Sequence, residues 1–296
     1  MQPIISIQNI SKSYGPIKAL NNVSFDVPEG SVFGVLGPNG SGKTTLLAII
    51  MDVLQSDGGS YSWLGGIPPD AARRQIGCLL ETPNFYHYMS AYDNLAVSAA
   101  LKRKGMDDRL RVLEIVGLTE RKDSKFQSYS LGMKQRLAIG AALLDSPKVL
   151  VLDEPTNGLD PNGIAEIREL ILDLNKQGIT IIIASHLLDE IEKVCTHVAI
   201  LKRGNLLLNG PVNEVLISED QIEIMATDMI LLENTVREMQ GVKKVNKTEQ
   251  TLQITCNEGI TTAHINEFCL NRGIVLSHLS LRKKSLETKF MELTNQ

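Results

Sequence analysis

The feature that most constrains this chain is one glycine-rich run between an apolar segment and a helical pattern. Residues 37–44 read Gly-Pro-Asn-Gly-Ser-Gly-Lys-Thr and fit the pattern G-x-x-x-x-G-K-[ST]. The run follows the apolar segment Ser31–Leu36 and precedes a helical pattern that begins at Lys43. Glycines let successive backbone N–H groups face phosphate oxygens, and the start of the following helix attracts anions. A glycine-rich turn without a ligand is the alternative, but this context favours a phosphate-binding loop.

The side chains of the loop have their own expected roles. Lys43 would supply a positive charge to the β- and γ-phosphates of a nucleoside triphosphate, and the Thr44 hydroxyl suits Mg²⁺. The residues expected to bind the nucleotide here are Gly37, Pro38, Asn39, Gly40, Ser41, Gly42, Lys43, Thr44 and Thr45.

A pair of acids ends the apolar run Val149–Leu152. Asp153 is suited to hold Mg²⁺ through water, and Glu154 to orient or deprotonate an attacking water. Two adjacent acids at the end of a strand could instead cap a helix. The phosphate-binding loop favours the catalytic interpretation, because a triphosphate and its metal ion must be held from both sides.

The segment from Ile4 to Pro211 alternates short β-rich runs with longer helical patterns, which predicts an α/β fold with a largely parallel sheet. Four of the runs are continuously apolar, as in strands that are covered on both faces. An antiparallel layer near the N-terminus is compatible with the pattern. The predicted strands are Ile5–Ile10, Ser31–Leu36, Ile76–Leu79, Val149–Leu152, Ile179–Ala184 and His197–Lys202. The predicted helices are Lys43–Val53, Asp93–Leu101, Arg109–Val116, Leu131–Asp145, Asn162–Gln177 and Leu187–Cys195.

The pattern changes after about residue 210, where the runs follow the order βαββαβ. This order predicts a small α+β domain, and 296 residues are enough for two domains. Strands are expected at Gln221–Ala226, Val242–Thr248, Leu252–Cys256 and Ile274–Leu281, with helices at Asp228–Met239 and Thr261–Asn271.

Composition and charge exclude several classes of protein. A chain with 43% hydrophobic residues is not one long disordered segment, and its net charge of −4 offers no basic surface to nucleic acid. No window approaches the roughly 18–20 apolar residues that a membrane-spanning helix needs, so action at a membrane requires a partner. The scattered cysteines form no CxxC pair and favour reduced, buried or half-buried thiols. They are Cys78, Cys195, Cys256 and Cys269.

Two further motifs lie in a recognisable order around the acidic pair. Residues 129–136 read Tyr-Ser-Leu-Gly-Met-Lys-Gln-Arg, and residues 155–160 read Pro-Thr-Asn-Gly-Leu-Asp. With the phosphate loop, they make residues 4–211 resemble the ATP-binding subunit of an ABC transporter. The resemblance implies a P-loop NTPase of ABC ATPase type, with a mainly parallel sheet, an antiparallel β-layer and a helical subdomain at about residues 82–145. The ATP-binding domain would span residues 1–214, and the small α+β domain residues 215–296.

The resemblance also implies roles for residues that their chemistry alone leaves open. Ser130 and Gly132 match the signature positions that contact the γ-phosphate bound by the opposite subunit, although Ser130 could simply cap a helix. Asp160 matches the residue that couples the two facing sites, or it is a turn residue. His186 matches the histidine that senses the γ-phosphate. Tyr14 matches an aromatic residue that stacks on adenine, while packing is the alternative.

This chain departs from the family in places. Leu131 stands where the signature usually has glycine and Met133 where glutamine is usual. Glu81 replaces a glutamine that contacts Mg²⁺ and senses the membrane partner, so that an oxygen ligand is kept and a charge is added. Glu81 and the following residues 82–89 resemble the bacitracin-resistance and lantibiotic-immunity branch of exporters. The aromatic residues of this segment suit either a groove for a helix of the membrane subunit or a self-packed subdomain.

The function implied is that of a motor subunit, which binds ATP and Mg²⁺ in a homodimer or heterodimer and drives a separate transmembrane permease. Such a subunit is cytoplasmic and peripheral on the inner face of the membrane. Export of a peptide antibiotic, drug or lipid-like compound is the expected activity. The alternative is a soluble ABC-type ATPase that acts on a cytosolic complex, but the chain has neither two phosphate loops nor sustained heptads.

Overall fold

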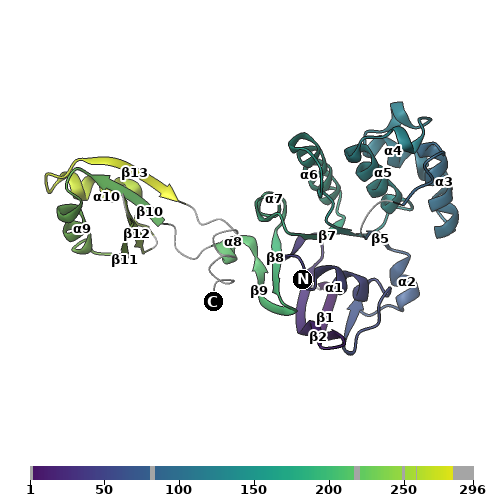
Figure 1. Cartoon of the computed structure of the whole chain (residues 1–296), viewed down its shortest axis with the longest axis horizontal. Coiled ribbons are helices and arrows are strands. Elements are labelled where there is room, and N and C mark those ends of the chain that lie inside the picture. The colour runs from purple at the N-terminus through teal and green to yellow at the C-terminus, as the bar shows by residue number, and fades with distance from the viewer. Residues whose placement is uncertain (1–2, 81–83, 217–220, 249–250, 258, 283–296) are drawn as a thin grey trace. The chain divides into compact units, whose positions relative to one another are not determined.

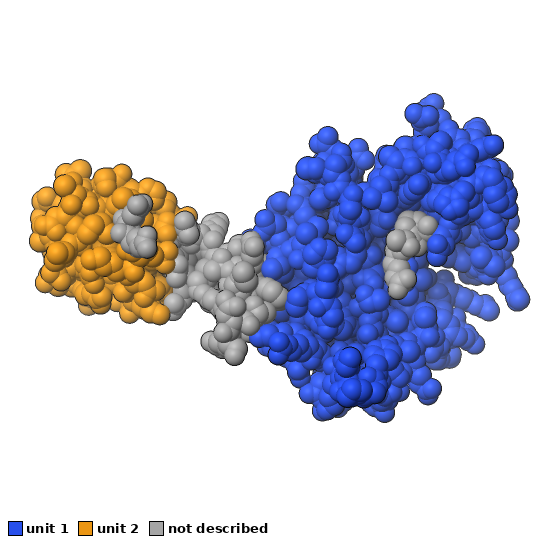
Figure 2. Space-filling view, viewed as in Figure 1, with its two compact units in different colours: residues 1–212 blue, residues 213–296 orange. Residues whose placement is uncertain are grey.

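The computed structural model of the chain describes residues 3–80, 84–216, 221–248, 251–257 and 259–282. The chain divides into two compact units, Met1–Val212 (unit 1) and Asn213–Gln296 (unit 2), which Figure 2 colours separately. Each unit has its own buried hydrophobic cluster.

A six-stranded sheet forms the centre of unit 1, in the order β5-β6-β7-β3-β8-β9. Its strands are β3 (Val32–Leu36), β5 (Ile76–Leu79), β6 (Val149–Asp153), β7 (Thr180–Ser185), β8 (His197–Lys202) and β9 (Asn205–Pro211). All neighbouring pairs are parallel except β8 with β9. Strands β3, β6 and β7 are buried along their whole length, which explains their continuous apolar sequence. The predicted parallel sheet is confirmed, with β9 as an antiparallel edge that was not predicted.

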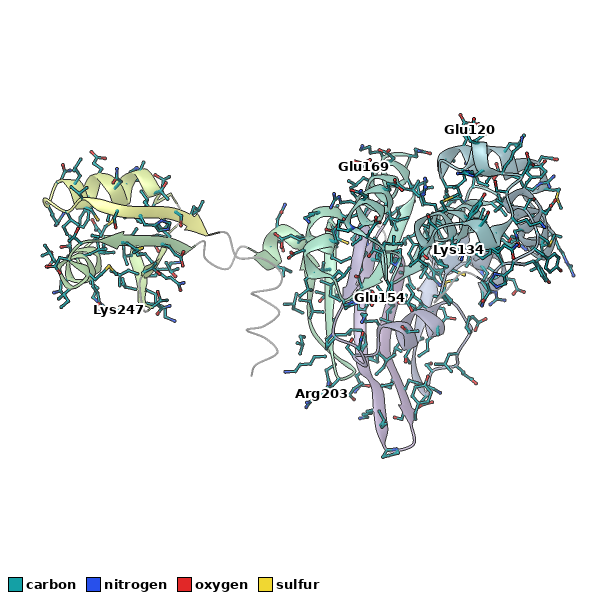
Figure 3. The ribbon with its side chains drawn as sticks, turned by 45° about the horizontal axis from the view of Figure 1, so that its top comes forward. Glu120, Lys134, Glu154, Glu169, Arg203 and Lys247 are labelled. Carbon is teal, nitrogen blue, oxygen red and sulfur yellow. The ribbon has the colours of Figure 1, made fainter. Side chains whose placement is uncertain are left out.

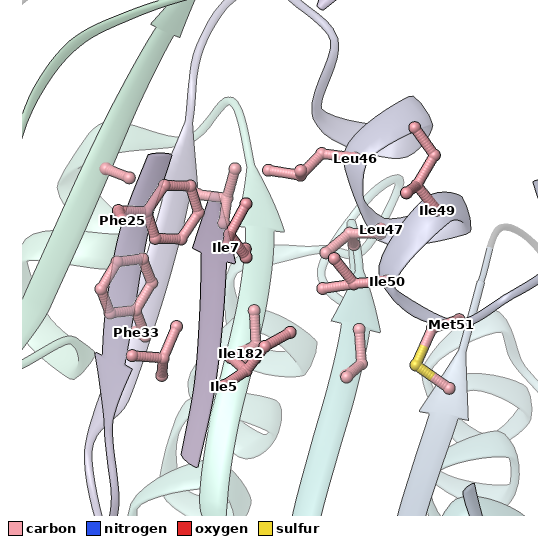
Figure 4. Packing of buried hydrophobic residues seen from close by; sticks show 14 of the residues in the cluster. Ile5, Ile7, Phe25, Phe33, Leu46, Leu47, Ile49, Ile50, Met51 and Ile182 are labelled. Atoms are coloured by element: carbon pink, nitrogen blue, oxygen red, sulfur yellow. The ribbon is translucent and has the colours of Figure 1, made fainter. Parts of the chain in front are cut away.

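A second, antiparallel sheet in unit 1 has the order β2-β1-β4 and confirms the N-terminal layer. Its strands are β1 (Pro3–Tyr14), β2 (Ile17–Pro28) and β4 (Gly58–Trp63). Helix α1 (Lys43–Ile50) contributes Leu46, Leu47, Ile49 and Ile50 to a cluster shared with residues of both sheets, such as Ile7 and Ile182 (Figure 4). The packing of α1 in this cluster fixes the position of its first turn, where the phosphate loop ends.

The other α-helices that lie wholly within the described part of unit 1 are α2 (Pro69–Arg73), α3 (Ala91–Lys102), α4 (Arg109–Ile115), α5 (Leu131–Leu143), α6 (Pro161–Lys176) and α7 (Leu188–Val194). Helices α3, α4 and α5 pack together as one group (Figure 1). The predicted helix Leu131–Asp145 ends two residues earlier, because Leu144 has ψ of 136° and leaves the helical region. None of the helices within the described residues is long and apolar enough to cross a membrane.

Unit 2 follows the order predicted for it. Its elements are α8 (Val212–Leu216), which begins at the last residue of unit 1, then β10 (Gln221–Ala226), α9 (Met229–Arg237), β11 (Val242–Lys247), β12 (Leu252–Cys256), α10 (Thr262–Leu270) and β13 (Leu276–Arg282). The sheet order is β11-β12-β10-β13 and every pair is antiparallel, which is the ferredoxin-like arrangement. Leu232 and Val236 of α9 and Ile265 of α10 are fully buried against the sheet residues Ile224 and Ile254.

The cysteines differ from expectation at one position. Cys195 and Cys269 are buried and Cys256 is half-buried, but Cys78 on strand β5 is exposed. All four are free thiols. Burial raises the pKa of the Cys256 and Cys269 thiols, so these side chains are kept neutral.

Candidate active site

Three adjacent parallel strands bring the predicted site residues to one edge of the central sheet. Leu36, at the end of β3, pairs with Ser185 at the end of β7, and Asp153 at the end of β6 pairs with Ala184. Because the carboxyl ends of parallel strands meet at one edge, the phosphate loop, Asp153 and the residue after Ser185 are neighbours. Ligands of open α/β sheets bind at this edge.

The phosphate loop connects β3 to α1 and depends on the absence of side chains. A Cβ atom at Gly37 would lie 2.3 Å from the carbonyl oxygen of Leu201, and one at Gly42 would lie 2.4 Å from that of Ala19. Gly42 also has φ of 106°, a left-handed angle that suits glycine. As the N-cap of α1, Gly42 supplies no side-chain hydrogen bond, so the backbone N–H groups of this turn are suited to an anion.

Lys43 lies inside the loop rather than in solvent. Its Nζ donates hydrogen bonds to the carbonyl oxygens of Gly37 at 2.8 Å and Pro38 at 3.3 Å, and it is 3.6 Å from Oε1 of Glu154. The side chain is only 6% exposed. The ammonium group is therefore held between the loop and the acid that follows β6.

The oxygens of Thr44 and Asp153 meet at the base of the loop. Thr44 Oγ1 donates a hydrogen bond of 2.8 Å to Asp153 Oδ2, although 109 residues separate them in sequence. Asp153 is buried, with 3% of its surface exposed. A hydroxyl and a carboxylate are the hard oxygen ligands that Mg²⁺ prefers, so this pair fits the ion.

Three neighbours hold the side chain and backbone of Glu154, whose position is labelled in Figure 3. Its backbone has φ of 48°, and its N–H donates to the carbonyl oxygen of Ala184 at 2.9 Å. Its Oε2 forms a hydrogen bond of 2.8 Å with Nδ1 of His186, which directly follows β7, and Oε1 faces Lys43. A left-handed angle at a non-glycine residue is a strain that surrounding structure must maintain, and such residues cluster at active sites. The carboxylate is positioned to act on a group bound beside Lys43.

The other predicted site residues make local contacts and do not join this cluster. Ser130 caps α5 by accepting a hydrogen bond from the N–H of Met133 at 3.2 Å. Asp160 caps α6 by accepting from the N–H of Gly163 at 3.0 Å. Tyr14 ends β1, is 49% exposed and has Lys12 Nζ 6.0 Å from its ring centre. Glu81 lies outside the described residues.

Sequence reasoning missed the role of Asn94 in shaping the aromatic segment after Glu81. Asn94 of α3 is 1% exposed, and its Oδ1 accepts from the N–H of Tyr86 at 2.8 Å. Its Nδ2 donates to the carbonyl oxygen of Ser90 at 2.9 Å and to that of Tyr86 at 3.1 Å. This fixed loop presents Tyr86 and Tyr88, which are 50% and 68% exposed. A buried amide is the signal that could have revealed it, because such a group must be hydrogen-bonded.

Comparison with known proteins identifies the family. The family model described as ABC transporter matches residues 20–157. An ABC transporter ATP-binding protein of Bacillus subtilis, YdbJ, is 36% identical over 99% of this chain and 96% of its own length. The chain belongs to the ABC transporter ATP-binding family. It is an ABC transporter ATPase, and its phosphate loop and acidic pair lie in the family's ATP-binding fold.

Other relatives of this ABC ATPase carry names that specify a cargo. The bacitracin transport ATP-binding protein BcrA of Enterococcus faecalis is 32% identical over 99% of this chain and 97% of its own length. The lantibiotic transport ATP-binding protein SrtF of Streptococcus pyogenes is 38% identical over 78% of this chain and 99% of its own length. Among solved structures, that of cbiO1 from Clostridium perfringens, part of the ABC transporter complex cbiONQ, has a TM-score of 0.67 and 28% identity over 81% of this chain and 96% of that one.

Proposed function

We propose that this chain is the motor subunit of an exporter, in which ATP-driven closure of two ATPase subunits moves a separate transmembrane permease. The proposed ATP hydrolysis is supported by the cluster of side chains at the carboxyl ends of β3, β6 and β7. There Glu154 faces both His186 and Lys43, and Thr44 pairs with Asp153. This combination holds a triphosphate and activates a water, as an ABC ATPase requires.

Each residue of the cluster has a proposed task. The loop N–H groups and Lys43 bind the β- and γ-phosphates, and Thr44 and Asp153 hold Mg²⁺, directly or through water. When bound, Mg²⁺ neutralises charge on the phosphates. Glu154 orients the attacking water and accepts its proton, while His186 holds the Glu154 carboxylate in place and contacts the γ-phosphate. Glu81 is proposed as a further oxygen ligand.

The dimer is proposed from residues that lie outside this cluster. Ser130 and Gly132 at the start of α5 would complete the ATP site of a second ATPase subunit, of the same or a related kind, and Asp160 would couple the two sites. The start of a helix attracts anions, which supports Ser130 and Gly132 as γ-phosphate contacts. Tyr14 would stack on the adenine of its own subunit.

The proposed cargo is a peptide antibiotic, a drug or a lipid-like compound. It is supported by relatives named for bacitracin and lantibiotic transport. The subunit would work on the cytoplasmic face of the membrane, docked on the permease through the exposed Tyr86 and Tyr88 of the helical subdomain. The net charge of −4 argues against binding to nucleic acid, because such binding depends on positively charged surfaces.

Replacement of Glu154 by glutamine tests the catalytic assignment. Glu154→Gln keeps the shape of the side chain but removes its basicity, so we expect ATP to bind as in the wild type and turnover to fall at least about a hundredfold. Equilibrium nucleotide binding and phosphate release measure the two quantities. Glu169→Gln on α6, which makes the same chemical change away from the cluster, is the control. Wild-type turnover in Glu154→Gln would refute the assignment.

Purification of the tagged Glu154→Gln chain from detergent-solubilised membranes with Mg-ATP tests the partner. We expect a stoichiometric multi-span membrane protein. Recovery only with ribosomes, DNA or soluble proteins would favour the alternative, a cytosolic ATPase switch.

A further inference from the structure

Two leucines and two glycines join the signature turn to the loop after Glu154. A Cβ at Gly158 would lie 3.1 Å from Cδ2 of Leu131, and a Cβ at Gly132 would lie 3.9 Å from Cδ2 of Leu159. Each segment therefore contributes one leucine that lies over a glycine of the other. Gly158 has φ of 76°, so a residue without a side chain is favoured there for a second reason.

These contacts lie between two helix caps. Leu131 directly follows Ser130, whose Oγ caps α5, and Leu159 directly precedes Asp160, whose Oδ1 caps α6. Leu131 is 48% exposed, so it joins the two turns by a contact at the surface of unit 1. The turn that contains Ser130 and the turn that contains Asp160 are thus in direct contact within the same chain.

The same loop leads back to the acid of the active site by short turns. The N–H of Leu159 donates to the carbonyl oxygen of Thr156 at 3.3 Å, and the N–H of Asn157 donates to that of Glu154 at 3.1 Å. Thr156 is 8% exposed, so the loop is anchored in the interior next to Glu154. Hydrogen-bonded turns therefore connect Gly158 to the backbone of Glu154, four residues earlier.

The geometry points to Leu131 as a positioning residue that couples the signature turn to Glu154 through Gly158. This inference rests on the proposed function for one step, in which nucleotide of the facing subunit engages Ser130. When that step moves the turn that contains Ser130, Leu131 changes the position of the loop around Gly158. The loop in turn changes the orientation of the Glu154 carboxylate. A glycine at position 131, which the family signature usually has, cannot make this contact because it lacks the side chain that reaches Gly158.

Truncation of Leu131 tests the coupling against a matched leucine. Leu131 and Leu110 are both on helices and are 48% and 52% exposed, so removal of either side chain loses a similar amount of packing. In the full chain, purified with the subunits that accompany it, we expect Leu131→Ala to lower kcat about tenfold and to leave Mg-ATP affinity within about twofold of the wild type. Leu110→Ala should change neither. Leu131→Met, which keeps a flexible apolar chain of similar length, should restore most of kcat.

A double-mutant cycle separates the direct contact from a general weakening of the fold. Gly158→Ala has two costs: its methyl group clashes with Leu131, and its backbone angle is strained. Truncation of Leu131 removes the clash but not the strain. We therefore expect Gly158→Ala to lower kcat several times less in the Leu131→Ala background than in the wild type.

The outcomes are distinct for this inference and for the proposed function. Additive effects in the cycle, equal kcat in Leu131→Ala and Leu110→Ala, or a parallel loss of nucleotide binding in Leu131→Ala would each overturn the role of Leu131. If Glu154→Gln abolishes turnover while Leu131→Ala behaves as wild type, only the coupling fails. If Glu154→Gln turns over normally, the proposed catalytic site itself fails.

Discussion

Helix α1 of unit 1 and helices α9 and α10 of unit 2 begin in different ways. Helix α1 of unit 1 begins after Gly42, which supplies no side-chain cap, at the end of a loop shaped by glycines. Helices α9 and α10 of unit 2 are capped by their own residues. Asp228 Oδ1 accepts two backbone N–H groups of α9, and Thr261 forms a reciprocal capping box with His264 on α10.

This difference separates a binding end from a structural end. Every helix leaves its first N–H groups without partners inside the helix, and a side-chain cap satisfies some of them locally. Unit 2 uses its own side chains and so gains stability at these ends. Unit 1 has no such cap at α1, where the N–H groups are suited to an anion, and the packing of α1 against residues of two sheets stabilises that turn.

Two left-handed glycines give the largest contrast between the units. A Cβ at Gly42 would lie 2.4 Å from a backbone oxygen, whereas a Cβ at Gly273, after α10, would have nothing within 4 Å. We expect Gly42→Ala to weaken ATP binding at least about a thousandfold, because the loop must deform. Gly273→Ala should cost only about 1 kcal/mol of unit 2 stability, from the strained φ alone, and leave binding unchanged. Equilibrium nucleotide binding and chemical denaturation measure both.

Normal ATP binding by Gly42→Ala would show that the backbone shape of this loop is not what holds the phosphates. Loss of ATP binding in Gly273→Ala would show that unit 2 affects the ATP affinity of unit 1, so the two glycines would no longer differ in the way predicted.

Removal of a core side chain from unit 2 tests that independence directly. Leu232 of α9 is fully buried, and Leu232→Ala should destabilise unit 2 by about 3 kcal/mol. The single tryptophan, Trp63, lies in unit 1, where it is 5% exposed, so its fluorescence reports on unit 1 alone. We expect the circular dichroism transition of unit 2 to shift while the Trp63 transition and the ATP affinity stay unchanged. Leu231→Ala, next to it and 51% exposed, is the control. A matching shift of the Trp63 transition would contradict independent units.

The sequence predicted best those parts of the fold in which local pattern and tertiary environment agree. Strands β3, β6 and β7 are buried on both faces, so their apolar runs coincide with their bounds within a residue or two. Strands β2 and β4 were not predicted. β2 contains Asn22 with φ of 50°, and β4 is rich in glycine and serine and is held by its pairing with β1. Tertiary pairing outweighs weak strand propensity there.

Some features of the candidate site likewise follow from the sequence pattern, and others depend on tertiary structure. The order of strand, loop and helix places the phosphate loop and the acidic pair at one edge, so the neighbourhood of Lys43, Asp153 and Glu154 follows from the pattern of a parallel sheet. The hydrogen bond between Glu154 and His186 does not follow, because it depends on the left-handed angle at Glu154. The contact between Leu131 and Gly158 depends likewise on the conformation of two loops, which no periodicity encodes.

Loss of one cap in unit 2 should have a smaller, local effect. Thr261→Ala removes the hydroxyl that accepts the N–H of His264, so unit 2 should lose about 1 kcal/mol of stability. Thr262→Ala, one residue inside the helix, is the matched control. Circular dichroism should show the shift of the unit 2 transition, without any change in Trp63 fluorescence or in ATP binding. If Thr261→Ala and Thr262→Ala destabilised unit 2 equally, the capping box would not be what stabilises the start of α10.

The smallest expected effect lies at the start of α4 in unit 1, where Asp108 makes no side-chain cap hydrogen bond and forms an ion pair instead. The Arg111 guanidinium and the N–H of Asp145 donate to Asp108, and they lower the pKa of its carboxyl below the usual value despite partial burial. A lowered pKa in the folded state means that the stabilisation is present above the unfolded pKa and is lost as the pH falls through the folded one.

Asp108→Asn should therefore cost less than about 1 kcal/mol at pH 7, since the pair is partly exposed, and the difference from the wild type should shrink only below about pH 4. Denaturation followed by Trp63 fluorescence at a series of pH values measures it, with the neighbouring Asp107→Asn as control. If the stability difference between Asp108→Asn and the wild type grew as the pH fell, the ionised Asp108 carboxylate would be destabilising, contrary to this prediction.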